Sequence, residues 1–97
     1  SLKSHGSIVL DSGAVQALLH KGASLLAKGI VTAEGDFDKG DAIWLCDSGG
    51  KQLAKGICQY SAAELKRICG AHSQQISDLL GYCPSEEVVH RDDLVLL

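Results

Sequence analysis

The stretch DAIWLCDSGGKQLAKGICQYS (residues 41–61) carries the clearest local pattern in the chain. Two runs rich in apolar residues, 42–46 and 52–60, flank the tetrapeptide Asp-Ser-Gly-Gly at 47–50. Glycine at such a position supplies the positive φ that tight hairpin turns require. The stretch therefore predicts a β-hairpin. Both faces of its first strand are apolar, so we expect the hairpin to be buried on both sides near its centre.

The residues before the hairpin predict a strand, a helix and a bent strand, at 7–11, 13–22 and 24–35. Asp11 and Ser12 offer side-chain oxygens that can cap the helix, and Gly22 follows its last periodic residue. Gly29 lies inside the second strand. A glycine within a strand marks a bulge or a close backbone approach.

The residues after the hairpin predict two short helices and a final strand. Ser61 and Glu64 form a capping-box pattern at the start of the first helix. Ser73 is expected to cap the second helix, which Gly81 ends. Residues 87–97 then read as a strand, a polar bend and a continuing strand. The order β-α-β-β-β-α-α-β has no βαβ period, which favours a small strand-rich barrel or sheet with short helices.

The bulk properties indicate one folded domain of 97 residues with an apolar content of 45%. No apolar run is long enough to span a membrane. The net charge of −3 disfavours a dedicated nucleic-acid domain, because phosphate neutralisation needs basic residues. The charge is uneven, however. Residues 1–33 and 55–75 are each mildly positive, and these two segments could meet on one face.

The cysteines are too widely spaced to predict a zinc site, since structural zinc sites use closely spaced pairs. Three of the four lie in apolar segments, where a free cysteine behaves as a small hydrophobic residue. We therefore expect no metal, and reduced thiols in a cytosolic protein, at all four positions: Cys46, Cys58, Cys69 and Cys83.

His90-Arg91-Asp92 is the tripeptide that protein kinases carry on their catalytic loop. The kinase motif also needs an asparagine five residues after the aspartate, and here only Asp93 and four apolar residues follow. We therefore reject the catalytic reading. The expected role is a closing strand with a charged bend, whose apolar side chains pack on the core at Val88, Val89, Leu94 and Leu96. The scattered histidines and acid pairs form no coherent active site, so the residues predict a non-catalytic module.

Four segments, taken in order, carry a resemblance to a known family: LDSGAVQALLHKGASLLAKGI, EGDFDKGDAIWLCDSGGKQLAKGICQYS, ELKRICGAHSQQISDLLGY and EVVHRDDLVLL. Over residues 6–97 the chain resembles the C-terminal PUA domain of bacterial glutamate 5-kinases (gamma-glutamyl kinases). The pattern G-x-F-x-x-G-D at 35–41 is shared among PUA domains generally. The terminal H-R-D-D-L-V-L is typical of the kinase's own PUA domain.

The resemblance implies a mainly β, α+β fold: a mixed-sheet pseudo-barrel of about five to six strands with two to three short helices. Residues 1–5 would be a leader, a linker or an expression scar, and 6–97 the PUA domain, an excised piece of something longer. The whole enzyme phosphorylates the γ-carboxyl of L-glutamate with ATP and Mg²⁺, in the first step of proline synthesis. That activity belongs to an amino-acid-kinase domain.

The resemblance therefore implies that this domain is not itself an enzyme and needs no cofactor. We expect a regulatory or architectural role, in proline feedback or in assembly of a cytoplasmic homo-oligomer with no membrane contact. The expected partner is the amino-acid-kinase domain of the same polypeptide.

PUA domains of RNA-modifying enzymes bind structured RNA, which leaves RNA binding as the alternative. Carried over from such relatives, the RNA face would hold residues 12–21 and a set of lysines and small or apolar residues: Lys21, Lys28, Gly29, Ile30, Lys55 and Gly56. The lysines would contact phosphate, and the glycines would allow a close backbone approach. Two residues depart from the pattern. Ala23 stands where many relatives have lysine, which removes a phosphate contact, and Ala27 stands where proline is frequent.

Overall fold

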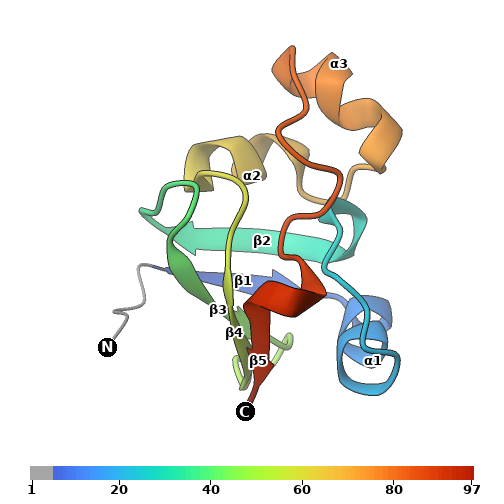
Figure 1. Cartoon of the computed structure of the whole chain (residues 1–97), viewed down its shortest axis with the longest axis vertical. Helices are drawn as coiled ribbons and strands as arrows, with labels where there is room; N and C mark the ends of the chain where they lie inside the picture. Colours follow the sequence, from blue (N-terminus) through green and yellow to red (C-terminus); the bar gives the residue numbers. More distant parts are fainter. Residues whose placement is uncertain (1–5) are drawn as a thin grey trace.

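Five strands form one mixed sheet in the order β2-β1-β3-β4-β5 in the computed structural model, which describes residues 6–97 (Figure 1). The predicted leader at 1–5 lies outside the described residues. The strands are β1 (Gly6–Leu10), β2 (Ile30–Gly35), β3 (Ala42–Cys46), β4 (Gln52–Ile57) and β5 (Leu94–Leu96). The helices are α1 (Ser12–His20), α2 (Ala62–Ile68) and α3 (Ile76–Leu80). Three short 3₁₀ turns are η1 (Ala27–Gly29), η2 (Ser73–Gln75) and η3 (Arg91–Asp93).

The sheet is mixed because β1 pairs with β3 in parallel, whereas the other neighbouring strands pair antiparallel. The parallel pair is possible because a helix, a turn and β2 separate β1 from β3 in the chain. The predicted α+β fold of about five to six strands and two to three short helices is confirmed, with five strands and three α-helices in residues 6–97. Among the described strands the sheet does not close into a barrel, because β2 and β5 are its two edges.

The core lies between one face of the sheet and the helices. Ile8, Leu45 and Ala54 are in register on β1, β3 and β4 and are fully buried. Helix α2 packs beside β2, and α3 extends beyond it (Figure 1). On the helical side of the core, Leu65 and Ile68 of α2 are fully buried.

The predicted hairpin is confirmed as β3 and β4. The Asp47 carboxylate accepts the amides of Gly49 and Lys51, both at 2.9 Å, and Gly50 has a φ of 87°. Both faces of β3 are largely buried, as expected. Strand β4 ends at Ile57 rather than at residue 60. The amide of Gln59 instead donates to Val88 O at 2.8 Å, so the chain leaves β3 to pair with the C-terminal segment.

The predicted capping box of α2 is also confirmed. Ser61 Oγ accepts the Glu64 amide at 3.1 Å, and Glu64 Oε1 accepts the Ser61 amide at 2.9 Å. The prediction for Ser73 was wrong by one residue. Ser73 is the first residue of η2, and His72 is the capping residue, whose amide donates to Gln75 Oε1 at 2.9 Å.

The segment 24–35 is not one bent strand. Leu25 forms an isolated bridge to Val89, η1 follows, and β2 begins only at Ile30. The chain turns against α1 before it enters the sheet, and Gly29 permits this close packing, because a Cβ atom there would stand 2.5 Å from the Cβ of Ala14 on α1.

The closing strand is confirmed in part. Val88 and Val89 are fully buried and Leu94 is half-buried, but Leu96 is 46% exposed. The packing predicted for Leu96 was wrong because β5 is an edge strand and little of the chain covers it. Among the described residues no helix is long and apolar enough to cross the lipid bilayer.

Candidate functional site

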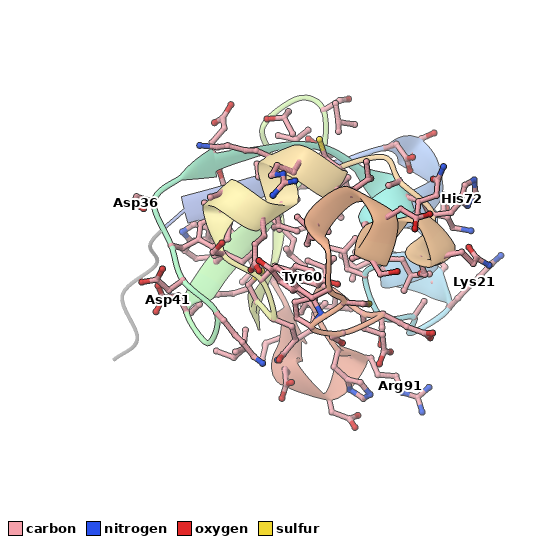
Figure 2. The ribbon with its side chains drawn as sticks, turned by 90° about the horizontal axis from the view of Figure 1, so that it is seen from above. Lys21, Asp36, Asp41, Tyr60, His72 and Arg91 are labelled. Carbon is pink, nitrogen blue, oxygen red and sulfur yellow. The ribbon has the colours of Figure 1, made fainter. Side chains whose placement is uncertain are left out.

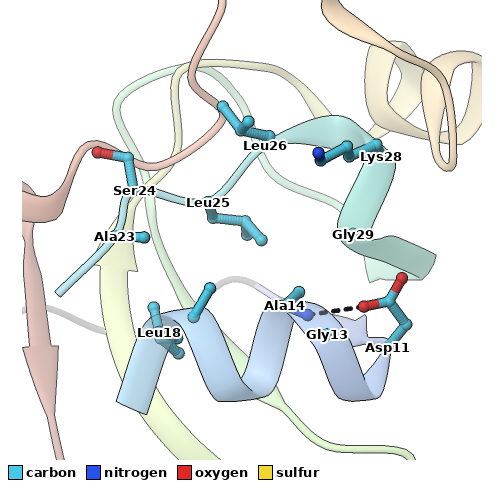
Figure 3. Close-up of a pocket in the computed structure, with 11 residues that line it drawn as sticks. Asp11, Gly13, Ala14, Leu18, Ala23, Ser24, Leu25, Leu26, Lys28 and Gly29 are labelled. Atoms are coloured by element: carbon cyan, nitrogen blue, oxygen red, sulfur yellow. Dashed lines mark hydrogen bonds between the residues drawn. The ribbon is translucent and has the colours of Figure 1, made fainter. Parts of the chain in front are cut away.

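A pocket of about 420 Å³ lies between α1 and the segment that leads into β2 (Figure 3). Its walls are mostly apolar, and its charged residues are Asp11 and Lys28. The lining residues are Asp11, Gly13, Ala14, Ala17, Leu18, Ala23, Ser24, Leu25, Leu26, Lys28 and Gly29. Small side chains on the facing side of α1 leave this space open.

Hydrogen bonds hold both walls of the pocket in place. Asp11 caps α1 by accepting the Ala14 amide at 2.7 Å, and the Asp11 amide donates to Gly29 O at 2.9 Å. On the other wall, Leu25 N donates to Val89 O at 2.9 Å. Ser24 Oγ accepts the Arg91 amide at 2.9 Å. The backbone of Arg91, within the terminal H-R-D, therefore helps to hold this wall in place.

Of the three predicted lysines, Lys28 lines this pocket and Lys21 and Lys55 do not. Lys28 also lines a second, more polar depression beside His72 and Glu86. Lys21 caps the C-terminal end of α1 and is exposed. Lys55 lies elsewhere, on β4, with its Nζ 4.8 Å from the ring centroid of Trp44. Such a cation–π contact ties the Lys55 ammonium to the sheet surface.

The two glycines of the predicted face already make close contacts within the chain. A Cβ on Gly56 would stand 2.6 Å from Val89 Cγ1 and 3.3 Å from Asp93 O, and a Cβ on Gly29 would meet Ala14. Both glycines are buried, as is Ile30. Internal packing is thus a sufficient physical reason for glycine at each position.

Figure 2 shows Lys21, His72 and Arg91 at one side of the view and Asp36 and Asp41 at the other. Acidic side chains also lie among the basic ones, since Glu86 lines a depression together with Lys28.

A second cluster, which the sequence patterns missed, joins α2 to the residues after α3. Tyr82 Oη donates to Glu64 Oε2 at 2.6 Å, and Arg67 Nη2 donates to Leu79 O. Burial raises the pKa of Glu64, but the hydrogen bonds from Ser61 and Tyr82 outweigh it, so the net shift is downward. The capping pattern identified Glu64, whereas no local signal pointed to Tyr82. The cluster fixes α3 relative to α2.

The buried titratable groups are kept neutral at physiological pH. Burial raises the pKa of the Cys58 thiol to about 11. Burial, with the nearby Cys83, raises the pKa of Tyr60 to about 12, and Tyr60 Oη donates to Ser85 O. Within residues 6–97, no three histidine, cysteine, aspartate or glutamate side chains gather as metal ligands would.

Residues 6–80 match the family model described as the PUA domain. The chain belongs to the PUA domain family. It is also 50% identical over 93 residues to glutamate 5-kinase from Deinococcus radiodurans, a match that covers 96% of this chain and 26% of that relative. This PUA domain is homologous to the C-terminal region of glutamate 5-kinases. It spans about a quarter of the length of the curated relatives it matches.

Solved structures show the same fold. A PUA domain from Aeropyrum pernix, crystallised as a tartrate complex, superposes with a TM-score of 0.64 at 23% identity, over 89% of this chain and 41% of that one. The archaeal box H/ACA sRNP Nop10–Cbf5 complex contains a chain that superposes with a TM-score of 0.62 at 19% identity. That match covers 96% of this chain and 23% of the other. At this identity the likeness concerns the fold.

Proposed function

We propose that this PUA domain is the non-catalytic C-terminal part of a glutamate 5-kinase, cytoplasmic and homo-oligomeric, which phosphorylates L-glutamate with ATP and Mg²⁺. The observation that carries the proposal is the 50% identity to such an enzyme over 96% of this chain. The phosphoryl transfer belongs to the amino-acid-kinase domain in the remaining three quarters of the polypeptide. In the parent enzyme the PUA domain tunes inhibition by proline or supports assembly.

The chemistry of phosphoryl transfer supports this division of labour. It requires a phosphate cradle and carboxylates that hold a metal ion. In the part of the chain that the structure describes, the charged residues are exposed or half-buried, and the walls of the pocket beside α1 are mostly apolar. Such a surface suits contact with another domain better than catalysis.

Deleting residues 6–97 from the parent enzyme tests the proposal. We expect the truncated enzyme to retain glutamate phosphorylation, because the reacting groups lie elsewhere. Either proline inhibition or oligomeric mass, measured by sedimentation, should change. Loss of turnover in a truncated enzyme that remains folded would contradict the non-catalytic assignment. An unchanged inhibition curve together with an unchanged mass would contradict the regulatory role.

RNA binding is the second candidate, favoured by the pocket between α1 and Lys28 and by the fold shared with a chain of the Nop10–Cbf5 complex. Against it, Lys55 is separate from that pocket and the domain is acidic overall. A titration with tRNA, followed by amide shifts, separates the two candidates. RNA binding predicts shifts in residues 12–21 and near Lys28 at about 50 mM salt, where phosphate contacts are strong. Absence of shifts at that salt concentration would eliminate this candidate.

A further inference from the structure

The edge strand β5 presents exposed apolar side chains. Val95 is 68% exposed, Leu96 46% and Leu97 71%. Residues 94–97 contain no charged side chain and no proline. Edge strands of monomeric proteins normally carry such residues, because they prevent pairing with another strand. An unprotected apolar edge is therefore a site of interaction.

The backbone of β5 is also oriented for pairing. The Leu97 amide donates to Leu53 O at 3.0 Å, so it points toward β4. Successive amides along a strand alternate in direction. The amide of Leu96, which is opposite Ala54 in the register, therefore points toward the open edge of the sheet. A further strand could bond to this edge without disturbing β4.

We infer that β5 is the docking edge for an extended apolar segment of the amino-acid-kinase part of the same polypeptide. This inference rests on the proposed function, because it takes the partner from the parent enzyme. The segment adds a strand beside β5 and packs apolar side chains on Val95 and Leu96. Basic side chains beside it face Asp92 and Asp93, which are exposed at the start of the strand.

A tethered partner fits this edge better than a second copy of the domain. A stable interface between free proteins buries about 800 Å² on each side, which exceeds what a three-residue strand can offer. Two copies would each bring a net charge of −3, and the segment 76–97 alone holds five acids against Arg91. A segment of the same polypeptide is instead present at roughly millimolar effective concentration, so a small contact is sufficient.

Amide hydrogen exchange in the 97-residue domain and in the full-length parent enzyme tests the inference. We expect the Leu96 amide to exchange at least about tenfold more slowly in the parent enzyme, because it gains a hydrogen-bond acceptor there. The amide of Leu45 in the central strand β3 reports that the domain is folded in both proteins. In the parent enzyme, Val95→Asp should return Leu96 to the fast rate. Val31→Asp is the matched control, since Val31 is 55% exposed on the opposite edge strand β2.

Equal exchange of Leu96 in the two proteins would overturn the inference. A dimer of the 97-residue domain that Val95→Asp dissociates would overturn it as well, because the edge would then serve a second copy. A different result would contradict the proposed regulatory function. Protection of Leu96 with unchanged proline inhibition and mass after deletion would leave the docking edge intact and remove only the regulatory role.

Discussion

Gly56 and Val89 approach so closely that a Cβ on Gly56 would lie 2.6 Å from Val89 Cγ1. Val89 is fully buried and pairs with Leu25, so this contact connects β4 to the wall of the α1 pocket. A side chain at position 56 would lie between the backbone of Asp93 and the branched side chain of Val89, and neither can move far in a closely packed interior. The contact between the sheet and the C-terminal segment thus depends on glycine at this position.

Gly56→Ala should destabilise the domain by about 1–3 kcal/mol, because the added methyl group forces Val89 or the backbone to move. Urea unfolding measures the change. Gly13→Ala is the control: its Cβ would meet only Asp11 Oδ1 at 3.5 Å, and alanine favours the helix by up to about 1 kcal/mol. Combining Gly56→Ala with Val89→Ala should cost less than the sum of the two single changes. Strict additivity would show that the two residues are not coupled.

Glu64 should make stability depend on acidic pH. Its pKa is lower in the folded state than its ordinary value of 4.5, so the folded state binds fewer protons than the unfolded state below that pH. The contribution is complete above about pH 4.5 and is lost as the pH falls through the lower folded pKa. Urea unfolding between neutral pH and pH 3 should show a steeper loss for the native protein than for Glu64→Gln.

Two variants refine this test. Tyr82→Phe should give an intermediate slope, because it removes only the hydroxyl that donates to Glu64 Oε2. Glu86→Gln removes the same charge at an exposed position on another segment and serves as the control. Equal slopes for the native protein and Glu64→Gln would contradict the assignment.

Tyr60 should make the stability of the domain fall as the pH rises in the alkaline range, whereas Glu64 makes it fall as the pH drops in the acidic range. Burial raises its pKa from 10 to about 12, so the neutral phenol is favoured in the folded state. The resulting stability is complete below pH 10 and is lost as the pH rises toward 12. Tyr60→Phe should lose about 1 kcal/mol at neutral pH, since Ser85 O loses its donor, but should show a flatter profile between pH 10 and 12. Urea unfolding followed by circular dichroism, at neutral pH and between pH 10 and 12, measures both effects.

The cysteines should react with a thiol reagent in the order of their exposure. Cys83 is exposed, whereas Cys58 is fully buried with a pKa raised to about 11 by that burial. We expect Cys83 to account for the fastest phase with Ellman's reagent at neutral pH, and Cys58 to react only as fast as the domain unfolds. Cys83→Ser should abolish the fast phase. Persistence of that phase in the variant would place the reactive thiol elsewhere.

The hairpin and the α2 capping box could be predicted because their signals are local. The turn glycine, Asp47 and the pair Ser61 and Glu64 act on neighbouring residues, so spacing alone identifies them. The sequence marked Gly29 and Gly56 as positions where the backbone is closely approached. It could not show which part of the molecule approaches them. Each glycine accommodates a side chain far away in the sequence, and the same residue type would equally suit contact with a nucleic acid.

In the candidate site, too, features close together in the sequence could be predicted and long-range contacts could not. Lys28 and α1 are close in the chain and lie together at one pocket. Lys55 was assigned to the predicted face by analogy with relatives, and the register of β3 with β4 places it over Trp44. The hydrogen bond from Tyr82 to Glu64 spans 18 residues and has no local signature.

A proline titration of the parent enzyme, with and without residues 6–97, tests the central claim most directly. Both enzymes are assayed for glutamate phosphorylation at the same glutamate and ATP concentrations, and oligomeric mass is recorded on the same samples. The account predicts retained turnover and a change in the midpoint of inhibition of at least about fivefold, the lower range of allosteric coupling, or a change in mass. Identical inhibition curves and identical masses would contradict it.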